Sequence, residues 1–482
     1  MRRIASRVEG LASSYGNSIV HPSTVINLEA SGEVKDRIRK LNERLARYVP
    51  PRETWTPAEE ALYKPVDLYR VPMDEARAMQ LKAIKHAFTR QYTLNRFYRS
   101  YCEMRGTTPE HIRTYDDLEK IPLLPDLTFK QHPSGEDFAY WITVIFTGDL
   151  PRVIVKGGDP TFDGVIKAFN EAGLTVALSS GTSGRHTVIP RDIRTQLNWE
   201  YAVAKLHLCM LDIAADHRLL LWPNPTKTNL AIAVAHAFWS ELYDGVEYAL
   251  DLEMGADLTF KAMADEERHA PAPPSAEDRQ RTIIETVIKW LERYARTTDT
   301  IGLVANPFLI HTLMDTLERE GIRFEFGERA MLHTGGGWKV SEDQRVSVAD
   351  FRKRVEEVLG IPETRCLDMY GMSEMMGMTL TCPEGHYLHL PYAWIKPLVL
   401  DSSLALADYG ERGRFAFLDG LAASYPGFIM SGDEVRMLEH CPVCDRPGPV
   451  LEPEIRRAKG QEMRGCAEVL RRVLAQTILE DN

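Results

Sequence analysis

The chain has 482 residues, 44% of them hydrophobic and 26% charged, which is a globular composition long enough for more than one buried core. The formal net charge of -11 argues against a nucleic-acid partner, because binding to a phosphate backbone needs clustered Lys and Arg. The longest apolar stretch, residues 230–239, is far shorter than the roughly 20 residues of a membrane span, so we expect a buried helix there and no span.

The first residues and the cysteines indicate the compartment. The N-terminus carries basic residues without an apolar core after them, so it does not have the pattern of a secretory signal. Seven cysteines, an odd number in so long a chain, do not suggest a disulfide framework. We therefore expect a cytoplasmic protein with reduced thiols.

The N-terminal residues 1–70 are predicted to form a helical extension. Ile38, Leu41 and Leu45 lie at helical spacing among basic residues, and a Pro-rich break follows at 48–51. From Val71 a longer helical pattern runs on to Phe88, and we expect the main domain to begin there.

Short apolar runs in the main domain alternate with longer helical patterns, which is typical of an α/β fold. Four of these runs are predicted strands, at residues 153–155, 175–178, 219–221 and 301–304.

A loop rich in Ser, Thr and Gly follows the predicted strand at 175–178. Its glycines permit a tight turn, while hydroxyls and amides can face an anion. The loop lacks the Gly-Lys-Ser/Thr ending of P-loop enzymes and the glycine spacing of a dinucleotide fingerprint. It indicates phosphate binding, with an ordinary surface loop as the alternative. Its members are Ser179, Ser180, Gly181, Thr182, Ser183, Gly184 and Arg185.

Three later clusters fit a nucleotide site. Successive glycines permit close backbone approach to a flat ligand, although a plain turn would also use them. An aromatic ring beside a glycine and a carboxylate suits the stacking of a base and the holding of a divalent cation. The clusters are Gly335, Gly336 and Gly337 before Trp338 and Lys339; Tyr370, Gly371, Met372, Ser373 and Glu374; and Ser431, Gly432 and Asp433.

With these motifs, residues 71–468 resemble the adenylate-forming superfamily of acyl-CoA synthetases, adenylation domains and firefly luciferase. The resemblance implies layered sheets flanked by helices plus a small β subdomain, at residues 71–455. It implies ATP and Mg2+ as cofactors, and activation of a carboxylic acid as acyl-AMP with release of pyrophosphate. It also implies that Tyr370 stacks on adenine, that Glu374 holds Mg2+, that the three glycines line the nucleotide, and that Asp433 accepts hydrogen bonds from the ribose hydroxyls.

Two branches of the superfamily are most similar. Residues 97–98, 114–118 and 121–123 resemble the phenylacetate-CoA ligases, whereas residues 335–339 and 464–466 resemble the acyl-protein synthetases of bacterial bioluminescence. We favour the second branch, which implies acyl transfer to a thiol of the chain itself, of a partner or carrier protein, or of coenzyme A. A phenylacetate-type ligase is one alternative, and a non-catalytic nucleotide- or acyl-binding regulatory protein is another.

The end of the chain departs from the family pattern. Members of the family continue into a mobile domain that supplies a lysine, of which residues 456–482 are expected to be a remnant. Charge build-up at the α-phosphate still needs a cation, and Lys339, Arg457 and Lys459 are candidates. We favour Lys339, with a surface lysine as the alternative.

Cys466 is the expected acyl acceptor within the chain. Its basic neighbours Arg464, Arg471 and Arg472 would lower the pKa of its thiol. An inert buried cysteine is the alternative.

A metal site is predicted from Cys382, His389, Cys441 and Cys444, four ligands suited to tetrahedral zinc. This set resembles the structural zinc site of some phenylacetate-type ligases. His386 can replace His389 in this interpretation, and unpaired loop thiols are the alternative. Four protein ligands leave no open position, so any zinc is expected to be structural.

Overall fold

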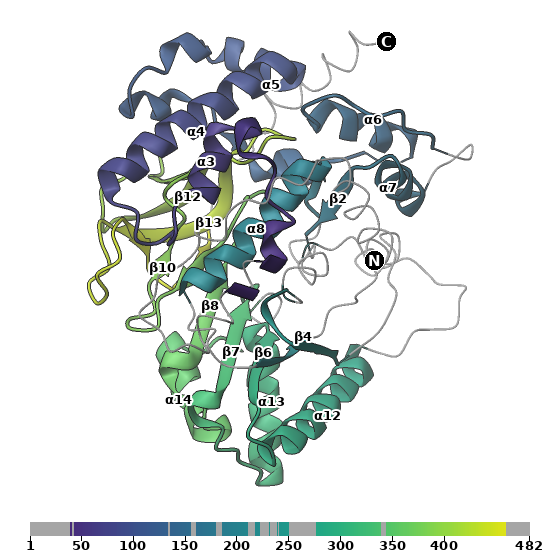
Figure 1. Cartoon of the computed structure of the whole chain (residues 1–482), viewed down its shortest axis with the longest axis vertical. Coiled ribbons are helices and arrows are strands. Elements are labelled where there is room, and N and C mark those ends of the chain that lie inside the picture. Colours follow the sequence, from purple (N-terminus) through teal and green to yellow (C-terminus); the bar gives the residue numbers. More distant parts are fainter. Residues whose placement is uncertain are drawn as a thin grey trace.

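The computed structural model describes residues 39–40, 43–133, 135–155, 161–179, 186–210, 217–221, 231, 239, 241–249, 276–338 and 344–458. These residues form the expected α/β fold, in which helices flank one large mixed sheet and a separate two-stranded hairpin (Figure 1). Along the large sheet the strand order is β11-β12-β13-β14-β10-β9-β8-β7-β6-β4-β5, with β1 and β15 both paired to β13.

The parallel half of the sheet contains β5 (Gly245–Tyr248), β4 (His217–Leu221), β6 (Thr300–Ala305), β7 (Ala330–Gly335) and β8 (Cys366–Tyr370). Helices α12 (Ala276–Ala295), α13 (Pro307–Glu320) and α14 (Val348–Leu359) surround its lower end in Figure 1. The described residues form two hydrophobic cores. Ile301 and Leu303 belong to the core that these helices share. Val304 and Met331 belong to the other core, to which α8 (Ile193–Met210) contributes. This alternation follows the two-residue period of a strand buried on both faces.

The antiparallel half contains β9 (Thr379–Thr381), β10 (Leu388–His389), β14 (Val450–Leu451), β13 (Phe428–Leu438), β12 (Arg412–Asp419) and β11 (Ile395–Leu400). Two short strands extend it at β13, namely β1 (Leu124–Pro125) in parallel and β15 (Arg456–Arg457) in antiparallel orientation. The long strand β13 therefore pairs with β1, which comes from a distant part of the sequence, as well as with β12, β14 and β15.

Helix α4 (Met73–Leu94) packs closely on this half. Buried Gln80 donates hydrogen bonds to the carbonyls of Tyr392 and Ile395, and buried Gln91 donates to those of Ala422 and Tyr425. A side chain at Gly420 would lie 2.8 Å from the Cβ of Ala83, so only glycine permits this approach of the helix.

The remaining described elements surround these two halves. They are the helices α3 (Pro57–Tyr63), α5 (Arg96–Met104), α6 (Glu136–Ile145) and α7 (Phe162–Glu171), the hairpin of β2 (Thr175–Leu178) and β3 (Val188–Arg191), and the 3-10 turns η2 (Arg52–Thr54), η3 (Pro109–His111), η4 (Asp116–Lys120), η5 (Asp126–Phe129), η6 (Gly327–Arg329) and η8 (Glu363–Arg365).

Most of the predicted elements are present. The helix expected after Val71 is α4, and the predicted strands at 175–178, 219–221 and 301–304 correspond to β2, β4 and β6. The strand expected at 153–155 is wrong: this segment has no regular structure and pairs with none of the described strands. Val153 and Val155 pack partly buried against the core, while Ile154 is 61% exposed. The predicted helix at 230–239 lies almost entirely outside the described residues. None of the helices in the described part of the chain is long and apolar enough to cross a membrane.

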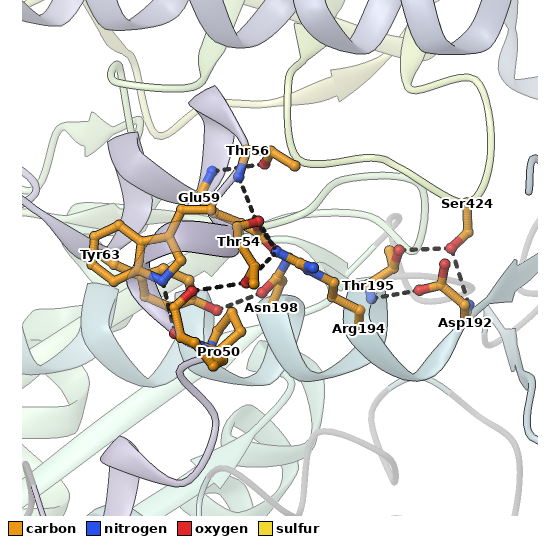
Figure 2. A network of polar contacts seen from close by, with 12 residues as sticks. Pro50, Thr54, Thr56, Glu59, Tyr63, Asp192, Arg194, Thr195, Asn198 and Ser424 are labelled. Atoms are coloured by element: carbon orange, nitrogen blue, oxygen red, sulfur yellow. Dashed lines mark hydrogen bonds and ion pairs between the residues drawn. The ribbon is translucent and has the colours of Figure 1, made fainter. Parts of the chain in front are cut away.

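A buried polar network joins α3 to α8 (Figure 2). Both oxygens of Glu59 accept hydrogen bonds from Arg194, at 2.6 Å each, and Glu59 Oε1 also accepts one from Asn198 at 2.9 Å. The Thr56 amide donates to Glu59 Oε2, which completes a capping box at the start of α3. Glu59 is therefore held as a charged carboxylate inside the protein.

We expect Glu59→Gln to destabilise the protein. Burial alone would raise the pKa of Glu59, but the hydrogen bonds from Arg194, the Thr56 amide and Asn198 lower it overall. The variant keeps the shape and loses the charge, which should lower the free energy of unfolding by about 1–3 kcal/mol.

Because the folded pKa of Glu59 is depressed, this stabilisation is complete above about pH 4.3 and is lost as the pH falls through the folded pKa. Urea unfolding of both proteins from neutral pH down to about pH 3 measures the difference, which should shrink below about pH 4.3. Glu60→Gln, which changes an exposed residue, is the control and should cost less than about 1 kcal/mol; equal effects of the two variants would contradict the prediction.

Candidate functional site

The glycine-rich loop connects the two strands of the β2–β3 hairpin. Leu178 pairs with Val188 at the end of the hairpin, so the loop begins at Ser179 and ends at His186 and Thr187. The two ends of the loop are bonded to each other: the Ser179 amide donates to the Thr187 carbonyl at 3.0 Å, and the Thr187 amide donates to Ser179 Oγ at 2.8 Å. Both ends of the predicted phosphate loop are therefore anchored at one place.

This hairpin contacts the segment that contains Glu374. Thr187 Oγ1 donates a hydrogen bond to Glu374 Oε1 at 3.0 Å, and the fully buried Arg191 donates to the Ser373 carbonyl at 2.7 Å. Thus the hairpin that carries the first predicted motif contacts the third predicted motif, although the two are nearly two hundred residues apart in the sequence.

The glycine cluster and the Tyr370 motif emerge at one edge of the sheet. Strands β7 and β8 are parallel, with Gly335 beside Met369, so both predicted motifs follow the carboxyl ends of neighbouring strands. Gly336 and Gly337 have positive φ values of 81° and 66°, which explains why glycine is used there. A side chain at Gly337 would meet nothing within 4 Å, so the backbone is open at that point.

Tyr370 is linked to Asp433 across this edge. The Tyr370 hydroxyl donates to Asp433 Oδ2 at 3.0 Å, and Arg457 NH1 lies 2.9 Å from Asp433 Oδ1. Phe415 packs edge-on against the Tyr370 ring, with 5.7 Å between the ring centroids. Burial raises the pKa of Asp433, and the Arg457 charge together with the Tyr370 hydrogen bond opposes that rise. The structure thus brings three of the predicted nucleotide-binding residues into one connected group.

Glu374 fits the predicted role of a magnesium ligand. Its side chain is almost fully buried, and burial raises its pKa while the positive charge of Lys130 opposes the rise. Carboxylate oxygens are the donors that Mg2+ prefers in proteins. Gly371, Met372 and Ser373 connect the end of β8 to Glu374, which lies in a turn.

Several predicted residues lie outside the described part of the chain. They are Ser180, Gly181, Thr182, Ser183, Gly184, Arg185, Lys339, Lys459 and Cys466.

Sequence reasoning missed four residues of this region. Thr187 and Arg191 bind the Glu374 segment, and Asp126 and Lys130 lie beside Asp433 and Glu374. The position of Thr187 directly after the loop is a signal that could have been used. No local pattern distinguishes Asp126 and Lys130, because their position depends on the pairing of β1 with β13.

The four predicted zinc ligands converge. One ligand atom from each of Cys382, His389, Cys441 and Cys444 lies within 4.8 Å of all the others. The two sulfurs of Cys382 and Cys441 are 4.0 Å apart, and Cys444 Sγ is 3.4 Å from His389 Nε2. Tetrahedral zinc with bonds of about 2.3 Å to sulfur and 2.0 Å to nitrogen separates its ligands by roughly 3.5–3.8 Å, so this donor set fits the ion.

Backbone amides support the same group. The Cys444 amide donates to Cys441 Sγ at 3.4 Å, and the amides of Gly385 and Tyr387 hydrogen-bond the thiol of Cys382. Amides that point at sulfur stabilise the thiolate, which is the form that binds a metal. His386, the alternative ligand, does not belong to the group of four and has a positive φ of 59° in the turn between Cys382 and His389.

The fold and the motifs that it brings together are similar to those of the adenylate-forming superfamily of acyl-adenylate-forming ligases. The fold of this chain is similar to that of a solved 2-hydroxyisobutyryl-CoA ligase in an open conformation in complex with 2-HIB-AMP and CoA. The TM-score is 0.55, with 16% identity over 84% of this chain and 78% of that one.

The sequence comparisons find similarity to one branch of that superfamily. Residues 253–475 match the family model described as "Acyl-protein synthetase, LuxE". Two similar proteins are each named long-chain-fatty-acid--luciferin-component ligase. The one from Vibrio harveyi is 24% identical over 82% of this chain and 88% of its own length, and the one from Aliivibrio fischeri is 22% identical over 84% and 91%.

Proposed function

We propose that this ligase activates a carboxylic acid with ATP and passes the acyl group to a protein thiol. In the first step a carboxylate oxygen bonds to the α-phosphorus, the bond from that phosphorus to the β-phosphate oxygen breaks, and pyrophosphate leaves. In the second step a deprotonated thiol bonds to the acyl carbon, and AMP leaves with the oxygen that joined them. The observation that carries the proposal is the convergence of the described ends of the hairpin loop, Glu374, Tyr370 and Asp433 in one region.

Each part of the site has a distinct task in this proposal. The Tyr370 ring stacks on adenine while Asp433 accepts hydrogen bonds from the ribose, and Gly335, Gly336 and Gly337 allow the backbone to approach the nucleotide. The loop 179–185 surrounds the phosphates. Mg2+ held by Glu374 would supply positive charge to the phosphate oxygens. The hydrogen bond from Thr187 fixes the Glu374 carboxylate beside the loop.

Two residues outside the described part of the chain, Lys339 and Cys466, also take part in our proposal. Lys339 supplies a cation after the nucleotide-lining glycines, and Cys466 accepts the acyl group. The long-chain fatty acids in the names of the two relatives make this class of acid the first to test. Coenzyme A, named in the similar solved structure, is the alternative acceptor.

The proposed domain organisation is a helical extension at 1–70, a catalytic domain at 71–455 and a C-terminal remnant at 456–482. Leu62 and Tyr69, from the extension, are buried in the same core as the catalytic domain. We also propose structural zinc at the group of four ligands between 382 and 444, and a cytoplasmic location, which suits the free thiols found among the described cysteines.

Pyrophosphate exchange tests the proposed function. The protein, with ATP, Mg2+ and labelled pyrophosphate, should form labelled ATP only when the correct acid is present. The acids to compare are short, aromatic and long-chain carboxylic acids. Binding of ATP without exchange for any acid would favour the non-catalytic regulatory protein instead.

The same incubation with a labelled acid identifies the acceptor. Mass spectrometry should find the acyl group on the peptide that contains Cys466, and Cys466→Ser should remove it. Label that persists in this variant would exclude Cys466 as the acceptor, and formation of acyl-CoA on addition of coenzyme A would favour the phenylacetate-type alternative.

A further inference from the structure

Asp126 and Lys130 form an ion pair next to the nucleotide residues. Strand β1 pairs in parallel with β13, with Pro125 beside Met430, so the chain leaves β1 at Asp126 next to the segment 431–433. The turn η5 then places Lys130 four residues later on the same side, where its Nζ donates a hydrogen bond to Asp126 Oδ2. Their side chains are only 14% (Lys130) and 7% (Asp126) exposed.

The pair is in contact with the region of Asp433. The point that a Cβ at Gly432 would occupy lies 3.5 Å from Asp126 Oδ2 and 3.5 Å from the guanidinium nitrogen NH1 of Arg457. Arg457 in turn pairs with Asp433. Position 432 is therefore within van der Waals contact of a charged group from each of the two ion pairs.

Lys130 also lies within electrostatic reach of both predicted site carboxylates. Burial raises the pKa of Glu374 and that of Asp433, and the Lys130 charge lowers both. The Asp126 charge has the opposite effect on each of them. The Lys130 ammonium therefore lies near both the proposed magnesium ligand and the proposed ribose ligand, close enough for the phosphates of a bound ATP to reach it.

The hydrogen bonding of Asp126 is incomplete. Its second oxygen, Oδ1, is buried without a hydrogen-bond partner, and the residue is only 5% exposed. Leaving a buried acceptor unsatisfied costs stability. An ion pair that served only to stabilise the fold would not be expected to contain such an acceptor. The arrangement suits a lysine that is held in place for a ligand.

We propose that Lys130 contacts the α-phosphate of ATP during adenylation and that Asp126 is its positioning residue. This inference rests on the proposed function. As the carboxylate oxygen bonds to phosphorus and pyrophosphate leaves, negative charge builds up on the phosphate oxygens. The Lys130 ammonium donates a hydrogen bond to one of these oxygens and keeps its proton throughout. Lys130 thereby provides a cation from the N-terminal part of the catalytic domain.

Two measurements on the full chain test this inference. The first is the affinity for ATP and for adenosine, which has no phosphates. Lys130→Met should bind ATP about tenfold more weakly and adenosine as well as the wild type does. The second is pyrophosphate exchange, which should fall about 100-fold in Lys130→Met and much less in Lys130→Arg, since removal of one preorganised donor typically costs about this factor.

Two further variants separate a role at the substrate from a structural one. Asp126→Asn should keep most of the exchange, because the lysine retains its charge. Lys396→Met changes an equally buried lysine that pairs with Glu119 at 3.2 Å, and should leave ATP affinity unchanged. Should Lys130→Met fail to fold, Lys130→Gln with thermal unfolding as a control takes its place.

The outcomes are distinct. Unchanged ATP affinity in Lys130→Met, or an equal loss of exchange in Asp126→Asn and Lys130→Met, would overturn the inference. A wild-type protein that binds ATP without exchange for any acid would refute the proposed function, while the ATP and adenosine affinities would still decide whether Lys130 contacts a phosphate.

Discussion

Glu374→Gln is expected to lower the rate of acid-dependent pyrophosphate exchange by about 10²- to 10³-fold, the cost of losing one preorganised charged group at a reacting centre. Glutamine fills the same space and can still accept the hydrogen bond from Thr187. It cannot supply the negative charge that holds Mg2+ beside the phosphates. The loss should therefore appear in the rate and in the Mg2+ concentration required, with the fold intact. Exchange measured over a range of Mg2+ concentrations separates the two effects.

Glu200→Gln is the matched control for this experiment. Glu200 is also buried, on helix α8, where it accepts a hydrogen bond from Gln196 at 2.9 Å. Burial raises the pKa of Glu200 to about 7, so a neutral side chain at this position is tolerated near neutral pH. We expect this variant to retain exchange within a few-fold of the wild type. Equal losses in both variants would mean that any buried carboxylate matters equally, and would remove Glu374 from the site.

Cys441→Ser should release the proposed zinc and destabilise the antiparallel half of the sheet. Cys382 and His389 lie in the β9–β10 hairpin, while Cys441 and Cys444 lie in the connection from β13 to β14. A metal bound by all four would join the two hairpins beside the β10–β14 pair. Since structural zinc contributes directly to folding, the loss in the free energy of unfolding should be on the order of 3–5 kcal/mol.

The zinc content and the unfolding temperature together test this prediction. The wild type should contain one zinc per chain and unfold at a lower temperature after treatment with a strong chelator. Cys441→Ser should contain no zinc, and the chelator should not change its unfolding temperature. Cys209→Ser changes a partly buried thiol on α8, outside the group of four, and should retain its zinc. A wild-type protein that holds no zinc and responds to neither zinc nor chelator would show that the four side chains are unmetallated.

Local patterns in the sequence were sufficient for much of the fold and for the motifs of the site. The helical period after Val71 predicted α4, and apolar runs predicted β2, β4 and β6, because burial of one or two faces leaves a clear period in the sequence. The nucleotide motifs were visible because each consists of consecutive residues. The spacing of Cys441 and Cys444 likewise predicted half of a metal site, because two cysteines three positions apart are themselves a local pattern.

Contacts between distant segments had no such pattern. The apolar run at 153–155 has the pattern of a strand, yet none of the described strands pairs with it, and Ile154 is exposed. Thr187 and Arg191 became part of the site only because the hairpin packs against the segment 373–374. A short segment of the sequence does not indicate which distant segment will pack against it in the folded protein.

The sequence by itself therefore determined the proposed class of chemistry, because the glycine-rich loop, Tyr370, Glu374 and Asp433 each belong to a local motif that is visible whatever surrounds it. Only the tertiary structure decided which cations accompany these groups. Asp126 and Lys130 reach Glu374 and Asp433 through the pairing of two-residue strand β1 with β13, a contact across some three hundred residues. Charge acts through space, and the distances that decide its effect exist only once the sheet has formed.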